Sequence, residues 1–568
     1  MFHQLLDPVA GNLFLSFIVG FIPIIVVLVL LGIVRWPAWQ AALSGLIVGL
    51  IIAIFVWQMP MGLAASSTLN GMAFGLVPVM WIVWNAMWLY NLTVRSGKFD
   101  LFRRWMVYNV PADKRILLLI IGFSFGALME GISGFGTPVA IGSALLVALG
   151  FPALEAVTLT LLFNTTPVAF GALGTPITTL ASVTGLKEGL LSAMVGRQLP
   201  IFGLLLPFYA LVVFAGFRSL RTVWPAALVA GVSFALTQFA VSNFIGAQLP
   251  DVLAALVSLI CTILFVQIWK PRDTEEYQAS FATVKETETG STAIGEEGIP
   301  SPGSSNDPTV ATPTSGEGRP SLSESLLGWM PWAMVSVVVI IWTLAKVPAI
   351  GTQPIQWPGL FHQVFLTSFN KGYAAGTYNF QPLGTGTAIL VSVLLTALIL
   401  IATGSKGSIL WLTLADTWKQ LRFAILTVML IIGLAYLYNF SGMATTLGVA
   451  LSAVGAIFPF LSVFLGWIAC FLSGSDTSSN ALFGNLQAVA ARQLNLSPVL
   501  MAATNSSGAV MSKMISPQNV TTGVSTVNLV GKEGLIIRRT FFHSIALAVI
   551  LGVIVMLQQY VFSGIIPH

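Results

Sequence analysis

The sequence predicts an all-α polytopic membrane protein with about 11 to 14 transmembrane helices. Of its 568 residues, 56% are hydrophobic and only 8% are charged. A soluble protein of this length surrounds its core with a charged shell, which so few charged residues cannot supply. Apolar runs approach the length of about 20 residues that crosses the hydrocarbon as a helix. These runs occupy residues 13–34, 39–57, 73–94, 201–217, 223–244, 252–269, 326–344, 388–402, 423–438 and 536–561.

One polar segment divides the chain into two membrane halves. Residues 271–323 are rich in Glu, Thr, Ser, Gly and Pro and poor in hydrophobic side chains. Such a segment buries too little apolar surface to offset the entropy of ordering it. We therefore expect a disordered linker between an N-terminal half, residues 1–270, and a C-terminal half, residues 324–568. Regulation through modified Ser or Thr is one role for it, and a simply tolerated insertion is the other.

The charge distribution indicates topology rather than nucleic-acid binding, although the formal net charge is +5. Basic residues gather at the ends of apolar runs, which the positive-inside rule assigns to the cytoplasm. They are Arg95, Lys98, Arg103, Arg104, Lys114 and Arg115, followed by Lys270 and Arg272. The two Cys lie in apolar runs and the four His are scattered, so we expect no metal site and no cofactor.

The same unusual phrase occurs once in each half. NTTPVAFGALGTP, residues 164–176, aligns without a gap on NSSGAVMSKMISP, residues 505–517. About 30 residues upstream of each lies a second polar break, EGISGFGTP (130–138) and SGSDTSSN (473–480). Hydrocarbon tolerates non-helical backbone only against protein or a water-filled cavity. Paired breaks in corresponding places therefore predict two repeats, broken helices and a transporter's substrate site between them.

Two carboxylates open the upstream breaks and are the proton-carrying candidates. Glu130 and Asp476 each follow a long apolar run. A charge near the bilayer centre costs about 2.5 to 3.5 kcal/mol on insertion scales, so it is rarely kept without a partner or a task. The alternative is that each accepts hydrogen bonds from the amides of its own broken helix. Asp476 also suits an ordinary N-cap.

Lys513 interrupts the second copy of the phrase where the first copy has Ala172. An ammonium there has no neighbour in sequence to neutralise it, so it needs a partner from elsewhere. A carboxylate substrate would serve, as would Glu130 or Asp476 in the empty site. The alternative is a Lys whose long stem reaches the membrane interface.

Small polar residues in the breaks are the substrate-binding candidates. Exposed amides at a new helix N-terminus form an anion site, and small hydroxyl side chains add donors without crowding it. Glycines let a loop approach a ligand closely. The alternative is that small residues merely let helices pack. The candidates are Gly134, Gly136, Asn164, Thr165, Thr166, Ser475, Thr477, Asn505, Ser506 and Ser507, together with Lys513.

At these residues the chain resembles the L-lactate permease family, which includes glycolate permeases. The motifs are FGALMEGISGFGTPVAI, NTTPVAFGALGTPI, VGRQLP, SNFIGAQLPD, GSDTSSNALFGNLQA and SKMISPQ, and the likeness skips residues 271–323. The resemblance implies uptake of L-lactate and related 2-hydroxymonocarboxylates, D-lactate and glycolate, with a proton across the bacterial inner membrane. It also implies an ion-transporter-like arrangement in which re-entrant hairpins and broken helices of two inverted repeats surround the site.

Two other classes of function stay open at this point. The first is a transporter of another small organic anion, coupled to sodium, because broken helices do not encode their ligand. The second is an intramembrane enzyme, which would need Asp or His at catalytic or metal-binding spacing. The sequence shows no such cluster and favours a non-enzymatic transporter whose partners are lactate, protons and the lipid bilayer.

Overall fold

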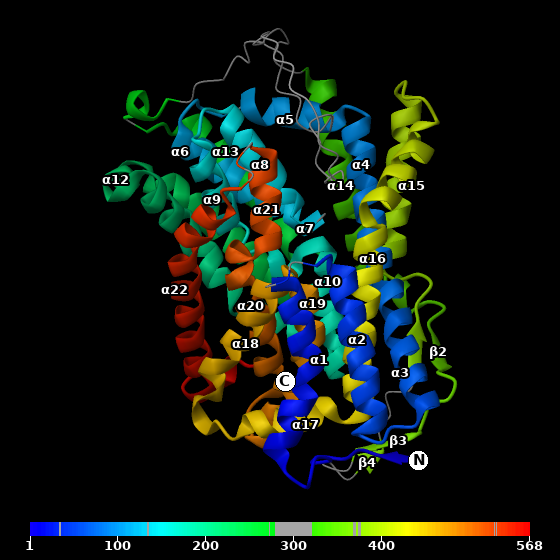
Figure 1. The fold of residues 1–568 in the computed structure, drawn as a ribbon. Helices are drawn as coiled ribbons and strands as arrows, with labels where there is room; N and C mark the ends of the chain where they lie inside the picture. Colours follow the sequence, from blue (N-terminus) through cyan, green and yellow to red (C-terminus); the bar gives the residue numbers. More distant parts are fainter. Residues whose placement is uncertain are drawn as a thin grey trace, which may run out of the picture.

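The computed structural model describes residues 1–32, 34, 36–108, 110–132, 134, 136–271, 273–278, 321–366, 371–372, 377–527, 529 and 531–568. Within them the chain is a helical bundle with a few short strands (Figure 1). Eleven helices are long and apolar enough to cross a membrane, or up to twelve if a pair bent by 65° counts as one span. The predicted all-α polytopic fold is confirmed, while the relation of the two halves as repeats stays a prediction.

The N-terminal half begins with strand β1 (Phe2–His3) and ends at the start of the linker. Its first helices are α1 (Leu13–Gly32), α2 (Ala38–Phe55), α3 (Met61–Phe74), π-helix η1 (Gly75–Met80), α4 (Trp81–Arg95), α5 (Lys98–Tyr108), α6 (Lys114–Leu117), π-helix η2 (Leu118–Phe125) and α7 (Gly126–Ile132). There follow α8 (Thr137–Ala148), α9 (Ala153–Phe163), η3 (Val168–Phe170), α10 (Gly171–Thr184), α11 (Glu188–Val195), α12 (Leu199–Phe244), α13 (Pro250–Ile268) and η4 (Thr274–Tyr277).

The C-terminal half contains the remaining strands before its own series of helices. It starts with α14 (Leu322–Leu344), η6 (Val347–Ala349), β2 (Gln353–Gln356), β3 (Val364–Leu366), β4 (Lys371–Gly372), β5 (Thr377–Phe380), α15 (Thr385–Ala402) and α16 (Ile409–Ser441). It continues with α17 (Met443–Ser452), η8 (Gly455–Ile457), α18 (Phe458–Ser473), α19 (Asp476–Gln493), α20 (Pro498–Ser512), η9 (Lys513–Ile515), α21 (Pro517–Thr526), α22 (Glu533–Tyr560) and η10 (Ser563–Ile565).

Helices from both halves mix in two packed groups. In one group α2, α3 and α4 pack against α15 and α16, and α14 packs on α15. In the other α18 packs on α20 and α22, α12 on α13, and α9 on α8, α12 and α22. Figure 1 shows the first group on the right and the second on the left. Helices α10 and α19 pack on each other and both touch α16, so they join the two groups.

Helix α12 shows how one glycine redirects a long apolar segment. The sequence predicts two spans there, residues 201–217 and 223–244, and the structure places both in the 46 residues of α12. Gly216 has φ of +74°, a left-handed torsion that only glycine adopts without strain, so the helix bends at that residue. The two predicted spans are therefore the two arms of one bent helix.

Short strands, which the sequence does not predict, lie on the face where the N-terminus lies (Figure 1). Strand β1 pairs in parallel with β3, and β2 pairs with β5 in antiparallel register. Each described strand has only two to four residues, too few to display the alternating pattern by which strands are recognised in sequence.

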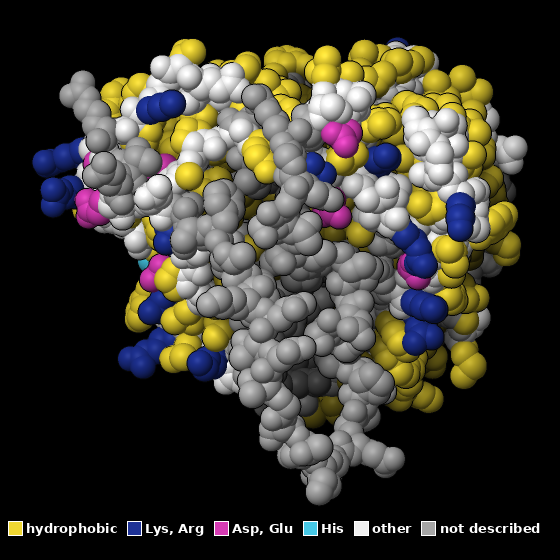
Figure 2. All heavy atoms as spheres, turned by 90° about the horizontal axis from the view of Figure 1, so that it is seen from above, with side chains coloured by type: hydrophobic (Ala, Val, Ile, Leu, Met, Phe, Trp, Pro, Cys, Tyr) yellow, Lys and Arg dark blue, Asp and Glu magenta, His cyan; other side chains and the backbone are white. Residues whose placement is uncertain are grey.

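The opposite face carries α5, α6 and the start of the linker (Figure 1). Figure 2, a view onto this face, shows Lys and Arg side chains around its edge, in agreement with the basic ends predicted from the sequence. Both ends of the predicted linker have regular structure: Gln278 forms a β-bridge with Asp113, and residues 321–323 cap and begin α14. Residues 279–320 lie outside the described residues, and their disorder stays a prediction.

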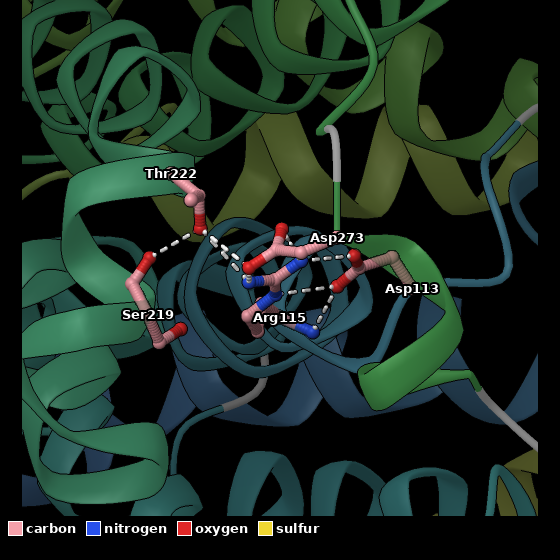
Figure 3. Close-up of polar contacts among 5 residues, drawn as sticks. All are labelled: Asp113, Arg115, Ser219, Thr222 and Asp273. Carbon is pink, nitrogen blue, oxygen red and sulfur yellow. Dashed lines mark hydrogen bonds and ion pairs between the residues drawn. The ribbon is translucent and has the colours of Figure 1, made fainter.

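An ion-pair cluster holds the start of the linker against the bundle (Figure 3). The Arg115 side chain is fully buried and donates to Asp113 at 2.7 Å and to Asp273 at 2.8 Å. Thr222 of α12 accepts from the same guanidinium at 3.0 Å. The hydrogen bond from Arg115 lowers the pKa of Asp273. Three segments far apart in the sequence therefore share one charge centre.

We predict that Arg115→Gln lowers thermal stability far more than Asp273→Asn. Removing the arginine leaves the buried Asp113 carboxylate uncompensated, a loss on the order of 3–5 kcal/mol. Asp273 is 31% exposed, and Arg115 keeps Asp113 in its absence, so this second loss is smaller. Thermal unfolding of the detergent-solubilised protein measures both, with Asp416→Asn, which removes an exposed ion pair with Arg95, as the control. Equal losses in all three variants would contradict the prediction.

The same cluster predicts a pH dependence with a definite sign. Because the pKa of Asp273 is lowered in the folded protein, its stabilisation is present at neutral pH. It is lost as the pH falls below the ordinary Asp value of 3.8 and through the lowered folded value. The stability difference between wild type and Asp273→Asn should therefore shrink on acidification within that range, as read from unfolding temperatures at a series of pH values.

Candidate functional site

Both predicted carboxylate-containing breaks interrupt helices in the structure. Helix α7 ends at Ile132 and α8 begins at Thr137, while α18 ends at Ser473 and α19 begins at Asp476. Gly136 and Gly474 have φ of +82° and +70° at these connections. Left-handed torsions reverse the chain within a few residues, and glycine adopts them without a steric penalty. Helices α18 and α19 pack against each other, so this pair forms a helical hairpin.

The second pair of breaks falls within the repeated phrase. Helix α9 ends before Asn164, and the next helix is bent by 65° relative to it. Ala172, Leu173 and Gly174 are all left-handed there, with φ of 43°, 55° and 78°. In the second copy α20 gives way to the short 3₁₀-helix η9 at Lys513, and Pro517 opens α21.

The structure corrects one part of the sequence interpretation. Asn164, Thr165 and Thr166 follow the C-terminal end of α9, and Asn505, Ser506 and Ser507 lie inside the unbroken helix α20, so neither set is at a helix N-terminus. Close packing explains the second case. A side chain at Gly508 would come within 3.0 Å of the Val463 backbone in α18. The small residues of the second copy thus let two helices touch, which was the alternative reading.

All four breaks meet at a single cavity of about 570 Å³. Six of the predicted residues line it, namely Glu130, Gly134, Ser475, Asp476, Thr477 and Lys513. The other predicted residues are buried outside its lining: Gly136, Asn164, Thr165, Thr166, Asn505, Ser506 and Ser507. The volume suits a small molecule. Residues from the two halves, more than 300 positions apart in sequence, therefore share one site.

A buried ion pair crosses this cavity. Lys513 Nζ lies 2.7 Å from Glu130 Oε1, and the two side chains are only 5% and 3% exposed. The interpretation of Lys513 as a residue that reaches the membrane interface is therefore wrong. Gly171 packs directly on the pair, because a side chain there would come within 2.8 Å of Glu130 Oε1. Glu130 Oε2 has no hydrogen-bond partner among the described residues.

Asp476 lies at the first position of α19 but does not cap the helix. The N-cap is Ser475, whose hydroxyl accepts from the Ser478 amide at 3.3 Å. Asp476 Oδ2 instead accepts from the Ser506 hydroxyl at 2.6 Å, and its Oδ1 has no partner among the described residues. The N-cap alternative is thus wrong, and Ser506 acts on the cavity through Asp476.

Two helix N-termini face the cavity, those of α19 and α21. They are not the N-termini that the sequence predicted within the repeated phrase. The first turns of α19 and α21 line it through Asp476, Thr477 and Ser478 and through Gln518 and Asn519. The Asn519 amide donates to the Gly474 carbonyl at 3.1 Å, which fixes the hairpin connection against α21. Helix N-termini favour anions because their first amides are unpaired and the helix dipole is positive there.

The cavity has an apolar wall that sequence analysis missed. It comes from α16 and the start of α2, in the first helix group. These residues are Pro37, Ala38, Trp39, Phe423, Ala424, Val428 and Ile431. In sequence they are indistinguishable from lipid-facing residues of a spanning helix, and only tertiary packing turns them toward the site. The cavity thus offers the Lys513 ammonium and two helix N-termini beside the acids Glu130 and Asp476, with an apolar wall from α2 and α16. This arrangement suits a small molecule that carries a charged group and a short apolar group.

Comparisons with known proteins agree with this chemistry. A family model described as L-lactate permease matches residues 16–562. The chain is 41% identical to glycolate permease GlcA of Escherichia coli strain K12 over 98% of each chain. It is 40% identical to an L-lactate permease of Bacillus subtilis strain 168 over 99% of each, and 37% identical to an L-lactate permease of E. coli K12 over the full length of both. The chain therefore belongs to the L-lactate permease family, whose members are membrane transporters and not enzymes.

Proposed function

We propose that the protein takes up L-lactate, and related 2-hydroxymonocarboxylates such as D-lactate and glycolate, together with a proton across the bacterial inner membrane. The single observation that carries the proposal is the buried Lys513–Glu130 ion pair in a cavity shared by both halves. The printed names of the relatives support the substrate class, because they include both a glycolate permease and L-lactate permeases.

In this proposal the substrate carboxylate replaces Glu130 as the partner of Lys513. A carboxylate near the ammonium is also within the influence of the N-termini of α19 and α21, which favour negative charge. The 2-hydroxyl group would hydrogen-bond to a polar lining residue such as Ser475 or Asp476. The methyl group of lactate, or the bare carbon of glycolate, would face the apolar wall formed by α2 and α16.

Substrate binding then creates the requirement for a proton. Once Lys513 pairs with the substrate, Glu130 would be a buried carboxylate without a counter-charge, which is strongly unfavourable. A proton on Glu130 removes that charge. One anion and one proton move together, so the transport step carries no net charge, and the membrane potential barely opposes it. Asp476 is the alternative proton carrier, because it is the other buried acid in the lining.

We predict that Glu130→Gln lowers the accumulation of lactate driven by a pH gradient in proteoliposomes at least about tenfold. This loss corresponds to about 1.4 kcal/mol or more. A glutamine keeps the shape of the side chain but cannot cycle a proton. Proton uptake recorded with a trapped dye should be lost as well. Asp476→Asn is the matched comparison, since it tests the second acid. Normal pH-driven uptake by Glu130→Gln, with normal expression and binding, would refute the role of Glu130.

We further predict that Lys513→Met weakens lactate binding by at least about tenfold, or 1.4 kcal/mol. The single variant should also unfold at a lower temperature, because it leaves Glu130 buried without a counter-charge. The double variant Glu130→Gln with Lys513→Met removes both charges and should recover that stability without recovering transport. Recovery of transport in the double variant would show that the pair has only a structural role.

The substrate class is tested by competition against labelled L-lactate. D-lactate, glycolate and L-lactate should compete, and lactamide, which lacks the negative charge, should not, because Lys513 has no anion to pair with. Uptake should depend on the pH gradient and be unchanged when sodium is replaced by choline. Competition by succinate with a strict need for sodium would instead favour the second candidate, a sodium-coupled transporter of another organic anion.

A further inference from the structure

A further buried acid, Asp251, lies outside the cavity lining and has no part in the proposed function so far. Asp251 is the second residue of α13 and is fully buried. Its Oδ1 accepts a hydrogen bond from Gln238 Nε2 of α12 at 2.8 Å. Its Oδ2 has no hydrogen-bond partner among the described residues. A buried carboxylate with a single neutral donor is unfavourable when ionised, so its retention calls for an explanation.

Asp251 adjoins the Glu130 segment. Helix α13 packs on α7 at Gly131, where a side chain would come within 3.0 Å of the Val252 amide nitrogen and 3.2 Å of Asp251 Cβ. The start of α13 at Asp251 therefore lies against the residue that follows Glu130 in the sequence. Lys513 donates a hydrogen bond to Glu130 Oε1, and Gln238 donates one to Asp251 Oδ1. Each acid is therefore left with one oxygen that has no partner among the described residues.

The charged residues around Asp251 and Glu130 balance only one of these two carboxylates. Helix α13 packs on α7, α10, α12 and η2. Glu130 is the charged residue of α7, whereas α10 and η2 contain no charged residue. In α12, Arg218 and Arg221 lie about 25 to 30 Å along the helix from Gln238. Lys513 thus compensates one of the two acids. The second acid is stable when it is protonated.

Glu188, a partly exposed acid, is hydrogen-bonded to the loop that precedes Asp251. Gln248, in the loop before α13, donates to Glu188 Oε1 at 2.7 Å, and the Thr178 hydroxyl donates to the same oxygen at 3.2 Å. Glu188 is partly exposed beside the α10–α11 connection. That end of α10 lies on the face of the N-terminus, because Asn439 donates to the Val183 carbonyl and its own carbonyl accepts from Gln4.

We propose that Asp251 is the proton donor to Glu130, and that protons reach it past Glu188 from the face on which the N-terminus lies. The O–H bond of Asp251 breaks as an O–H bond forms on Glu130 Oε2, directly or through one water. The electron pair stays on Asp251, which then takes a new proton from the Glu188 side. The inference rests on the proposed function, in which Glu130 is protonated when the substrate takes Lys513. Asp251 is thus a positioning residue for the proton and makes no contact with the substrate.

Asp251→Asn tests this role, because it keeps the shape and the bond to Gln238 but cannot release a proton. We expect lactate uptake driven by a pH gradient to fall at least about tenfold. Exchange of labelled for unlabelled lactate at equal pH needs no net proton turnover and should stay within about twofold of wild type. Ser258→Ala is the matched control, because Ser258 is a buried polar residue on the same helix and does not titrate.

A second variant covers the case in which Asp251→Asn does not fold. Gln238→Leu removes the donor to Asp251, so the carboxylate holds its proton more tightly and the pH profile of uptake should move to higher pH. Unchanged uptake and an unchanged pH profile in these variants would overturn the proposal, as would equal loss of exchange and net uptake in a folded Asp251→Asn protein. If wild-type uptake moves no protons at all, the proposed function itself fails. If wild type is proton-coupled and the variants behave as wild type, only the relay fails.

Discussion

The proposed mechanism depends on a buried salt bridge between the two halves of the chain. Lys513 and Glu130 come from different halves of the chain and meet in the cavity at 2.7 Å. Neither charge is tolerable there alone, so the pair constrains how the two halves can pack. In the proposed mechanism an anion that engages the ammonium releases the acid. The same contact would then stabilise the empty protein and couple substrate binding to a change in protonation.

Broken helices make that contact possible. An unbroken helix would satisfy its own amides and carbonyls and would present only side chains to the cavity. Breaks at the α7–α8, α9–α10, α18–α19 and α20–α21 connections line it instead, and side chains of neighbouring helices bind backbone at two of them. Asn519 binds the Gly474 carbonyl, and Asn480 donates to the Pro176 carbonyl at 3.2 Å. At these two breaks a side-chain amide thus binds a backbone carbonyl.

The sequence predicted the fold class and the positions of the breaks, because Gly, Ser and Pro within long apolar runs have few other physical explanations. It also predicted the acids and the lysine of the cavity, since isolated charges in such runs are conspicuous. It could not predict which helix end faces the cavity, because Asn505 to Ser507 suit a helix interior as well as a terminus. It missed Asp251 for a related reason. A residue beside a helix end appears interfacial until packing shows its depth.

Ala172 and Leu173 have a further consequence for how such a protein evolves. Their left-handed torsions, at φ of 43° and 55°, each oppose folding by about 1–2 kcal/mol relative to ordinary backbone. The strained turn positions Gly171 against Glu130 and starts α10 at the edge of the cavity. Glycine at either position would relieve the torsional penalty, so a side chain is kept at both positions at a cost in stability.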